Sequence, residues 1–153
     1  MKSQTELLLE LWLEARTRFT NQLATLTPEE LPKRLGDSPN SVGFLIRHIG
    51  DVEFLFAKNV FGDSTLKVSA KTVIDHRDTG EWTDWEALKS RGAESFEKLH
   101  AVVEKQTDAD WEASITTREF GTKTKAEAFG RIVSHTAYHA GQLALIRKYG
   151  TTE

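Results

Sequence analysis

Apolar side chains recur at steps of three or four residues in four separate stretches of this chain. That spacing matches the α-helical turn of about 3.6 residues and gathers the apolar groups on one helix face. The sequence therefore predicts four long amphipathic helices, over residues 3–26, 39–61, 83–105 and 124–149. Helices that each bury one face must pack against one another. We expect an all-α fold, a four-helix bundle, in which residues 1–153 form a single domain.

Most predicted helix starts share a capping signal, a Ser or Thr followed three residues later by Glu. In such a capping box the hydroxyl and the carboxylate satisfy backbone N–H groups that the first helical turn leaves unpaired. The second long helix has a different start signal, Ser38 followed by Pro39. After one of the boxes, Pro28 opens only a short helical turn that ends near Gly36. The capping boxes begin at Ser3, Thr27, Thr83 and Thr124.

Two of the predicted connections are long, residues 63–82 and residues 107–123. The first is polar and lacks a sustained period, so we expect a surface loop. The second begins with a turn at residues 107–110 and holds a short extended segment within residues 115–120. Connections of this length exceed what a minimal up-down bundle needs and often carry part of a functional site. On the inner face of the third helix, Gly92 is expected to permit a close helix approach.

Composition excludes several kinds of site and partner. The chain has no cysteine, which excludes disulfides, thiolate nucleophiles, iron–sulfur clusters and cysteine-type zinc sites. Its 20 Lys and Arg are interspersed with 23 Asp and Glu for a net charge of -3, which argues against a nucleic-acid partner. Glu10 and Glu14 interrupt the leucine-rich start, so that segment is neither a signal sequence nor a membrane span. We expect a soluble cytoplasmic protein with no membrane partner.

Three of the five histidines lie in or beside the apolar face of a predicted helix, His48 in its centre and His135 and His139 at its edge. The other two are expected to be exposed, because His76 lies among charged loop residues and His100 lies away from the apolar face of its helix. His48 falls near the centre of the apolar stripe of the second helix. A buried imidazole without a partner costs about 1–3 kcal/mol, so a partner is required. That partner is either a hydrogen-bonding group of the core or a metal ion.

His135 and His139 stand at positions i and i+4 of the fourth helix, so both rings project from one face. Such a pair can reach one metal ion with nitrogen–metal distances of about 2.0–2.1 Å. Taken alone, the pair is equally compatible with a structural role. Together with His48 it forms a set of three neutral ligands, which leaves coordination positions open. Zinc, nickel, copper and iron(II) all accept such ligands.

The histidine pair is not the signature of a zinc peptidase. Thr136, Ala137 and Tyr138 separate the two histidines, so the glutamate of His-Glu-x-x-His is missing. That glutamate is the general base of the peptidase mechanism. The sequence therefore argues against peptide hydrolysis of that kind.

Two motifs give the chain a resemblance to a known family. Residues 41–51 read SVGFLIRHIGD, with a histidine followed by an apolar and a small residue and then an acid. Residues 134–142 read SHTAYHAGQ, with His-x-x-x-His and Gly-Gln shortly after it. In these motifs, and loosely in its helical pattern, the chain resembles the DinB/YfiT-like superfamily of small bacterial four-helix-bundle proteins.

The resemblance implies a metal site and further properties. Members hold a divalent metal, often nickel or zinc, through three histidines that map here onto His48, His135 and His139. They are commonly homodimers. Some branches are thiol-dependent S-transferases or isomerases that use a low-molecular-weight thiol, and many others have no assigned reaction. The resemblance therefore implies a divalent transition-metal cofactor, a homodimer and a small-molecule thiol or other small substrate.

The three histidines are compatible with three interpretations. In the first, the protein is a metal-dependent enzyme, an S-transferase or a hydrolase, whose ion lowers the pKa of a bound thiol or water. In the second, it is a non-catalytic or stress-related scaffold whose ion braces two helices. An open coordination position beneath a pocket favours the enzyme, and a fourth protein ligand favours the scaffold. In the third, the histidines hydrogen-bond to one another without a metal.

Three more residues are candidates for contacts near the ion. Tyr138 and Gln142 share the helix of the histidine pair, and Asp51 follows His48 by one turn. A carboxylate at that distance can orient a ligand by hydrogen bonding. For Asp51, however, a solvated carboxylate is the favoured interpretation.

The four tryptophans are candidates for shaping a pocket. Two of them, Trp82 and Trp111, lie in or beside the long connections. For these two, holding the connections against the bundle is the favoured interpretation. The complete set is Trp12, Trp82, Trp85 and Trp111.

Overall fold

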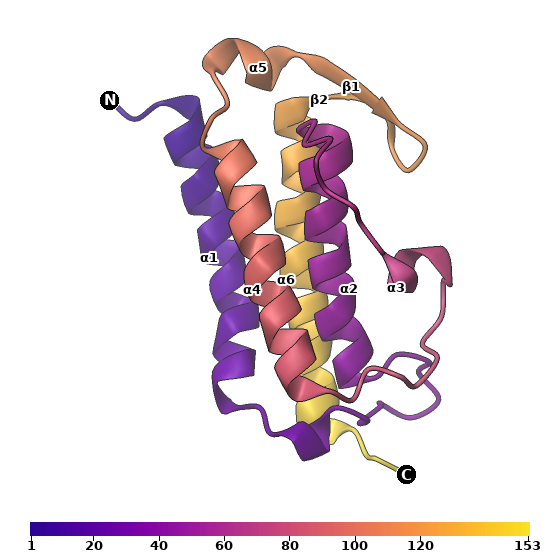
Figure 1. The fold of residues 1–153 in the computed structure, drawn as a ribbon. Helices are drawn as coiled ribbons and strands as arrows, with labels where there is room; N and C mark the ends of the chain where they lie inside the picture. The colour runs from indigo at the N-terminus through magenta and orange to yellow at the C-terminus, as the bar shows by residue number, and fades with distance from the viewer.

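The structure of the protein, a computed structural model, describes residues 1–153 and is mostly helical. Four long helices lie side by side in it, as Figure 1 shows. The expected all-α class holds for most of the chain, but a small two-stranded sheet also occurs. None of the helices combines the length and the apolar character that crossing a membrane requires. The long helices are α1 (Gln4–Thr25), α2 (Val42–Leu55), α4 (Trp85–Val103) and α6 (Lys125–Tyr149).

The direction of the helices explains the length of the connections. In Figure 1, α1 and α6 run one way along the molecule, and α2 and α4 run the other way. Because α2 and α4 are consecutive long helices that run in the same direction, the chain between them must return over the full length of the molecule. That return includes α3 (Lys71–Ile74), a single helical turn. The predicted featureless loop over residues 63–82 is therefore wrong at α3.

The second connection also folds more than predicted. Thr107 caps a short helix, α5 (Asp108–Glu112), where the sequence had predicted a turn. Strands β1 (Ser114–Thr117) and β2 (Gly121–Thr124) then pair antiparallel as a hairpin. The predicted extended segment at residues 115–120 is correct only for its first half, because the hairpin turn occupies the rest.

Most capping predictions are confirmed. Complete capping boxes occur at Ser3 and Thr124, and another at Thr27 opens a 3-10 turn, η1 (Pro28–Glu30). At α4 the cap is Asp84, whose carboxylate accepts a hydrogen bond from Ala87 N at 3.0 Å, and not the predicted Thr83.

The predicted ends of the second helix both need correction. The helix starts at Val42 and not at Pro39, because Ser41 Oγ accepts from Phe44 N at 3.1 Å and takes the capping role from Ser38. At its other end α2 does not continue regularly to residue 61. It widens into a π-helical turn, η2 (Phe56–Val60), before Gly62 adopts a positive φ of 77°.

Close packing depends on Gly43 and not on the predicted Gly92. A Cβ atom at Gly43 would lie 1.8 Å from the backbone oxygen of Trp82, so the return connection can touch α2 only where a side chain is missing. Around Gly92 there is open space for a Cβ atom. Gly43 therefore permits the close approach of a loop, whereas between α2 and α4 the close glycine is Gly50, where an added Cβ atom would lie 3.3 Å from Ser95 Oγ.

Two clusters of buried apolar side chains fill the interior. The tryptophan predictions are confirmed for the two loop residues, since Trp82 and Trp111 are both buried against the bundle. The indole N–H of Trp111 donates to Thr5 Oγ1 at 2.7 Å, which ties the second connection to the start of α1. Trp12 is fully buried in the same cluster as Trp111.

Candidate metal centre

The three predicted histidines meet between α2 and α6. His48 projects from α2, and His135 and His139 project from successive turns of α6. The Nε2 atoms of His48 and His135 lie 3.1 Å apart. The ring of His139 is centred 4.9 Å from that of His48 and 4.3 Å from that of His135. One nitrogen from each ring lies within 4.8 Å of the other two.

This geometry can hold a metal ion. Two nitrogens bound to one ion at about 2.0–2.1 Å, at tetrahedral or octahedral angles, lie about 2.8–3.4 Å apart. The separation of 3.1 Å between the Nε2 atoms of His48 and His135 falls within that range. No aspartate, glutamate or further histidine belongs to the cluster. The donor set is thus three imidazoles, which suits zinc, nickel, copper or iron(II).

The surroundings keep the three rings neutral. Burial, with a smaller contribution from His139, lowers the pKa of His48 to about 4. Burial also lowers the pKa of His135 to about 3, with further contributions from His139, His48 and Arg131. For His139 burial lowers the pKa, and its hydrogen bond to Gln142 acts in the opposite direction. Metal binding needs the unprotonated imidazole, so at neutral pH no proton has to be removed first.

His48 is oriented by a residue that lies far away in the sequence. Thr72 Oγ1, on α3, lies 3.1 Å from His48 Nδ1 and donates a hydrogen bond of 2.7 Å to Asp51 Oδ2. Because the hydroxyl proton goes to the carboxylate, the imidazole must supply the proton of the other hydrogen bond. His48 therefore carries its proton on Nδ1 and directs the lone pair of Nε2 toward the other histidines.

Asp51 is fully buried, so the favoured prediction of a solvated carboxylate is wrong. Its Oδ1 accepts hydrogen bonds from Arg47 Nε at 2.8 Å and from Arg91 NH2 at 2.7 Å. Its Oδ2 accepts from both the hydroxyl and the backbone N–H of Thr72. Two guanidinium groups compensate one buried charge, which explains how the carboxylate tolerates the interior. Asp51 acts on His48 through Thr72 and not by direct contact.

The two candidate residues on α6 differ in how they contact the histidine cluster: Gln142 makes a hydrogen bond to it, and Tyr138 contacts it only through its ring. Gln142 Oε1 accepts a hydrogen bond of 2.7 Å from His139 Nδ1, which leaves His139 Nε2 free to bind a metal. Tyr138 is 65% exposed, and its ring stands 5.2 Å from that of His139 without a hydrogen bond to the cluster. His135 Nδ1 is buried and has no hydrogen-bond partner.

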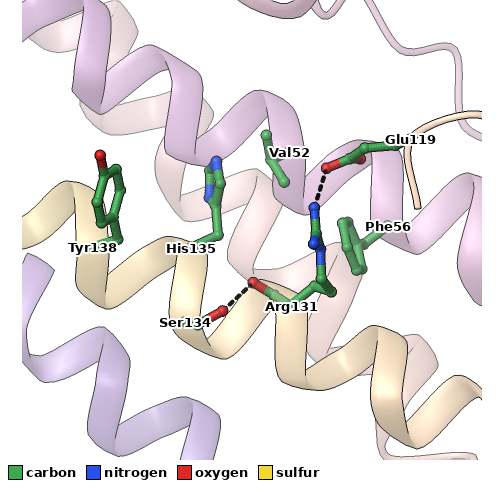
Figure 2. Close-up of a pocket in the computed structure, with 7 residues that line it drawn as sticks. All are labelled: Val52, Phe56, Glu119, Arg131, Ser134, His135 and Tyr138. Carbon is green, nitrogen blue, oxygen red and sulfur yellow. Dashed lines mark hydrogen bonds and ion pairs between the residues drawn. The ribbon is translucent and has the colours of Figure 1, made fainter.

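A pocket of about 260 Å³ opens beside the cluster, and Figure 2 shows the side chains around it. His135 is the one histidine of the cluster that lines the pocket. The pocket has an apolar wall from α2 and η2, polar groups from α6, and one residue from the turn of the hairpin. The lining residues are Val52, Phe56, Glu119, Arg131, Ser134, His135 and Tyr138.

The remaining predicted residues lie elsewhere. His76 is exposed, as expected. His100 is half-buried and not exposed, because its ring packs 5.6 Å from Phe96 and 6.4 Å from Trp12. No tryptophan lines the pocket beside the histidines; Trp85 instead borders a separate groove between α1 and α4.

Sequence reasoning missed two residues near the histidine cluster. Thr72, on the return connection, makes a hydrogen bond to His48, and Arg91, on α4, donates one to Asp51. Sequence reasoning also missed a buried network in which Arg16 makes two hydrogen bonds of 2.7 Å to Glu53. Ser95 Oγ adds a third hydrogen bond to this carboxylate at 2.9 Å. One signal was present in the sequence. Residues 42–55 are apolar on almost every side, and charged residues inside such a helix require partners.

The family model of the DinB superfamily matches residues 11–143, which include the three histidines, Thr72 and Asp51. The chain belongs to the DinB superfamily. The resemblance seen in the two histidine motifs is thereby confirmed over most of the chain. No curated protein matches the sequence.

Proposed function

We propose that this DinB-superfamily chain is a metal-dependent enzyme that binds one divalent ion through His48, His135 and His139. One observation carries the proposal: a cluster of three histidines has no fourth ligand, and one of them lines a pocket. Three protein ligands leave coordination positions for a water or a substrate. A pocket at that position gives such a substrate a place to lie.

The proposed reaction is the transfer of a small group to a low-molecular-weight thiol. A divalent ion, when bound, acts as a Lewis acid that lowers the pKa of a thiol or water in an open position. The chain has no cysteine, so a nucleophilic thiol must come from a cosubstrate. The three histidines would hold the ion, with Thr72 and Gln142 fixing two of the rings. Hydrolysis, with water in place of the thiol, is the alternative reaction at the same site.

A non-catalytic scaffold is the second candidate. The cluster joins α2 to α6, so an ion bound there would brace two helices whatever its chemistry. The pocket beside His135 and the lack of a fourth ligand argue against this function. The interpretation without a metal is supported by the distance of 3.1 Å between the Nε2 atoms of His48 and His135, which also suits a hydrogen bond.

We propose nickel or zinc as the ion, because these are the metals that the resemblance to the DinB/YfiT-like superfamily implies, and neutral imidazole binds both. We also infer that residues 1–153 form one domain with the four-helix bundle of the DinB/YfiT type, and that the protein acts in the cytoplasm.

A homodimer is the proposed assembly. Large apolar side chains are exposed on α1, at Leu7 and Leu11, and on α6, at Leu145 and Tyr149. Each pair stands four residues apart and therefore shares one helix face. Exposed apolar groups of this kind mark interaction surfaces. Light scattering coupled to size-exclusion chromatography tests the proposal, with a mass of twice 17.3 kDa expected and a mass of 17.3 kDa contradicting it.

The first test is metal content. We would purify the untagged protein without chelator and measure bound metals by ICP-MS in wild type, His139→Ala and His76→Ala. Wild type and His76→Ala are expected to hold about one transition-metal ion per chain, and His139→Ala to lose it, because only His139→Ala removes a ligand. His76 is the matched control because it is an exposed histidine of the same chain.

Two results would contradict the proposal. Wild-type protein that holds no metal, even after incubation with zinc and nickel, leaves the histidines with a structural role. Metal that binds but never exchanges a coordinated water for an added thiol supports the scaffold. If metal and exchange are both found, thiol-transfer reactions are the ones to assay with the identified ion.

A further inference from the structure

The pocket beside His135 contains one positively charged side chain. Arg131 stands on α6 at the position four residues before His135, so its base is about 6 Å away along the helix axis. Figure 2 shows the guanidinium of Arg131 at one end of the pocket, with His135 farther along the same helix. A ligand that reaches both must be short and must present two different groups.

The partner of Arg131 is easily displaced. Arg131 NH2 lies 3.5 Å from Glu119 Oε1, and the two side chains are 49% and 61% exposed. Exposed ion pairs of this kind contribute little to stability. A carboxylate that makes two parallel hydrogen bonds to a guanidinium binds it more strongly than a single long contact does. Glu119 lies in the turn of the β1–β2 hairpin, so it can move away without disturbing a helix.

The wall between these two groups is apolar. Val52 of α2 lines the pocket between His135 and Arg131, and Phe56 of η2 lines it beside Arg131, as Figure 2 shows. Such a wall suits a short hydrocarbon chain. At about 260 Å³ the pocket is below the usual size for drug-like ligands, which is about 300–1,000 Å³.

From these three features we propose that the pocket binds a small aliphatic carboxylate. Arg131 takes the carboxylate in place of Glu119, Val52 and Phe56 hold the hydrocarbon chain, and the reactive end lies at the three-histidine cluster. The proposal rests on the proposed function for the position of the reactive end. It adds the substrate class and assigns Arg131 as the residue that determines specificity.

The experiment compares three short thiols that differ only in their terminal group. The probes are 3-mercaptopropionate, its neutral amide, and the cationic 2-aminoethanethiol. Each would be titrated into nickel-loaded protein at pH 7, with thiolate-to-nickel absorption as the measure of binding. Wild type is expected to bind the carboxylate at least about tenfold more tightly than the amide, a ratio that one charge-assisted pair can supply.

Variants assign that preference to a residue. Arg131→Gln is expected to abolish it, Arg131→Lys to retain part of it, and Glu119→Gln to increase it because the competing carboxylate is gone. Arg18→Gln is the matched control: it removes the same charge at an exposed position of α1, outside the pocket, and should leave the preference unchanged. Circular dichroism spectra of all variants verify that each is folded.

A second measurement does not need the metal. In metal-free protein, butanoate is expected to shift one arginine Nε–H signal in a nitrogen–proton NMR spectrum, and butanamide is not. That signal should be missing in Arg131→Gln. Equal affinity for carboxylate and amide, a preference that survives in Arg131→Gln, tighter binding of the amine, or no butanoate shift would each overturn the proposal. Nickel-loaded protein that responds to none of the thiols would contradict the proposed enzyme instead, and the butanoate titration would still decide the carboxylate site.

Discussion

Thr72 Oγ1 lies 3.1 Å from His48 Nδ1 and 2.7 Å from Asp51 Oδ2, so a single hydroxyl links a buried charge to a candidate metal ligand. A carboxylate only accepts hydrogen bonds, which fixes the direction of the whole chain of bonds. The proton on His48 Nδ1 is held toward Thr72, and Nε2 is left with its lone pair. The long connection after α2 therefore takes part in the centre through one side chain.

Removing this hydroxyl should weaken metal binding. We expect Thr72→Val to lower the affinity for zinc by about 10–100-fold, the usual effect of losing a partner that orients a ligand. Valine keeps the shape of threonine but cannot accept the proton of His48. Competition with a chromophoric chelator gives the affinity, and Thr72→Ser, which keeps the hydroxyl, serves as the control. Equal affinity in wild type and Thr72→Val would show that His48 needs no such partner.

The difference between Thr72 and the histidines shows what the sequence can predict. His135 and His139 lie on one face because of helical periodicity, and His48 lies in an apolar stripe for the same reason. Thr72 gives no such signal. It stands 24 residues from His48 in a segment without period, and the contact arises only because the connection returns along α2.

The features of the fold can be divided in the same way, into those that local sequence patterns predict and those that depend on tertiary packing. The long helices and most caps follow from local patterns, since capping and amphipathicity involve residues three or four apart. The close contact of Gly43 with Trp82 depends on tertiary packing, and so does the burial of Asp51 beside Arg47 and Arg91. Such long-range contacts determine which glycine is required and which carboxylate is buried, and helical periodicity contains neither.

The metal-free protein should lose stability as the pH falls below about 6.5. Burial lowers the pKa of His48 to about 4 and that of His135 to about 3 in the folded state. In the unfolded chain both return to about 6.5, so between these values the unfolded state binds more protons. The contribution of these two histidines to the free energy of unfolding is complete above about pH 6.5. It is lost as the pH falls toward their pKa values in the folded state.

Thermal unfolding of metal-free protein between pH 7 and pH 4.5 tests this dependence. His135→Gln should show a smaller decrease in Tm over that range, because it removes the group with the lowest pKa of the two. His76→Gln alters an exposed histidine and should follow wild type. Parallel curves for wild type and His135→Gln would mean that this histidine does not contribute.

A methyl group at Gly43 should be far more damaging than one at Gly92. At Gly43 the added carbon would lie 1.8 Å from the backbone oxygen of Trp82, so the return connection would have to move. At Gly92 it would meet open space, and alanine favours the helix over glycine by about 1 kcal/mol. Urea unfolding of the two alanine variants measures the difference. A Gly43→Ala variant as stable as wild type would contradict the close approach.

Removing one member of the buried pair of Arg16 and Glu53 should destabilise the protein strongly, and replacing both members with apolar residues should destabilise it little. Glu53 is fully buried and receives two hydrogen bonds of 2.7 Å from Arg16 and one of 2.9 Å from Ser95. Glu53→Gln keeps the shape but leaves the guanidinium without a counter-charge. We expect it to lower the free energy of unfolding by about 3–5 kcal/mol.

Replacing both members of the pair separates lost charge from lost packing. Arg16→Met combined with Glu53→Leu should recover most of that loss, because it removes both buried charges while filling similar volume. Glu10→Gln, at the exposed pair with Lys2, is the matched control and should change the free energy of unfolding by less than about 0.5 kcal/mol. If the double variant is as unstable as Glu53→Gln, the network stabilises the fold through its geometry and not by neutralising a buried charge.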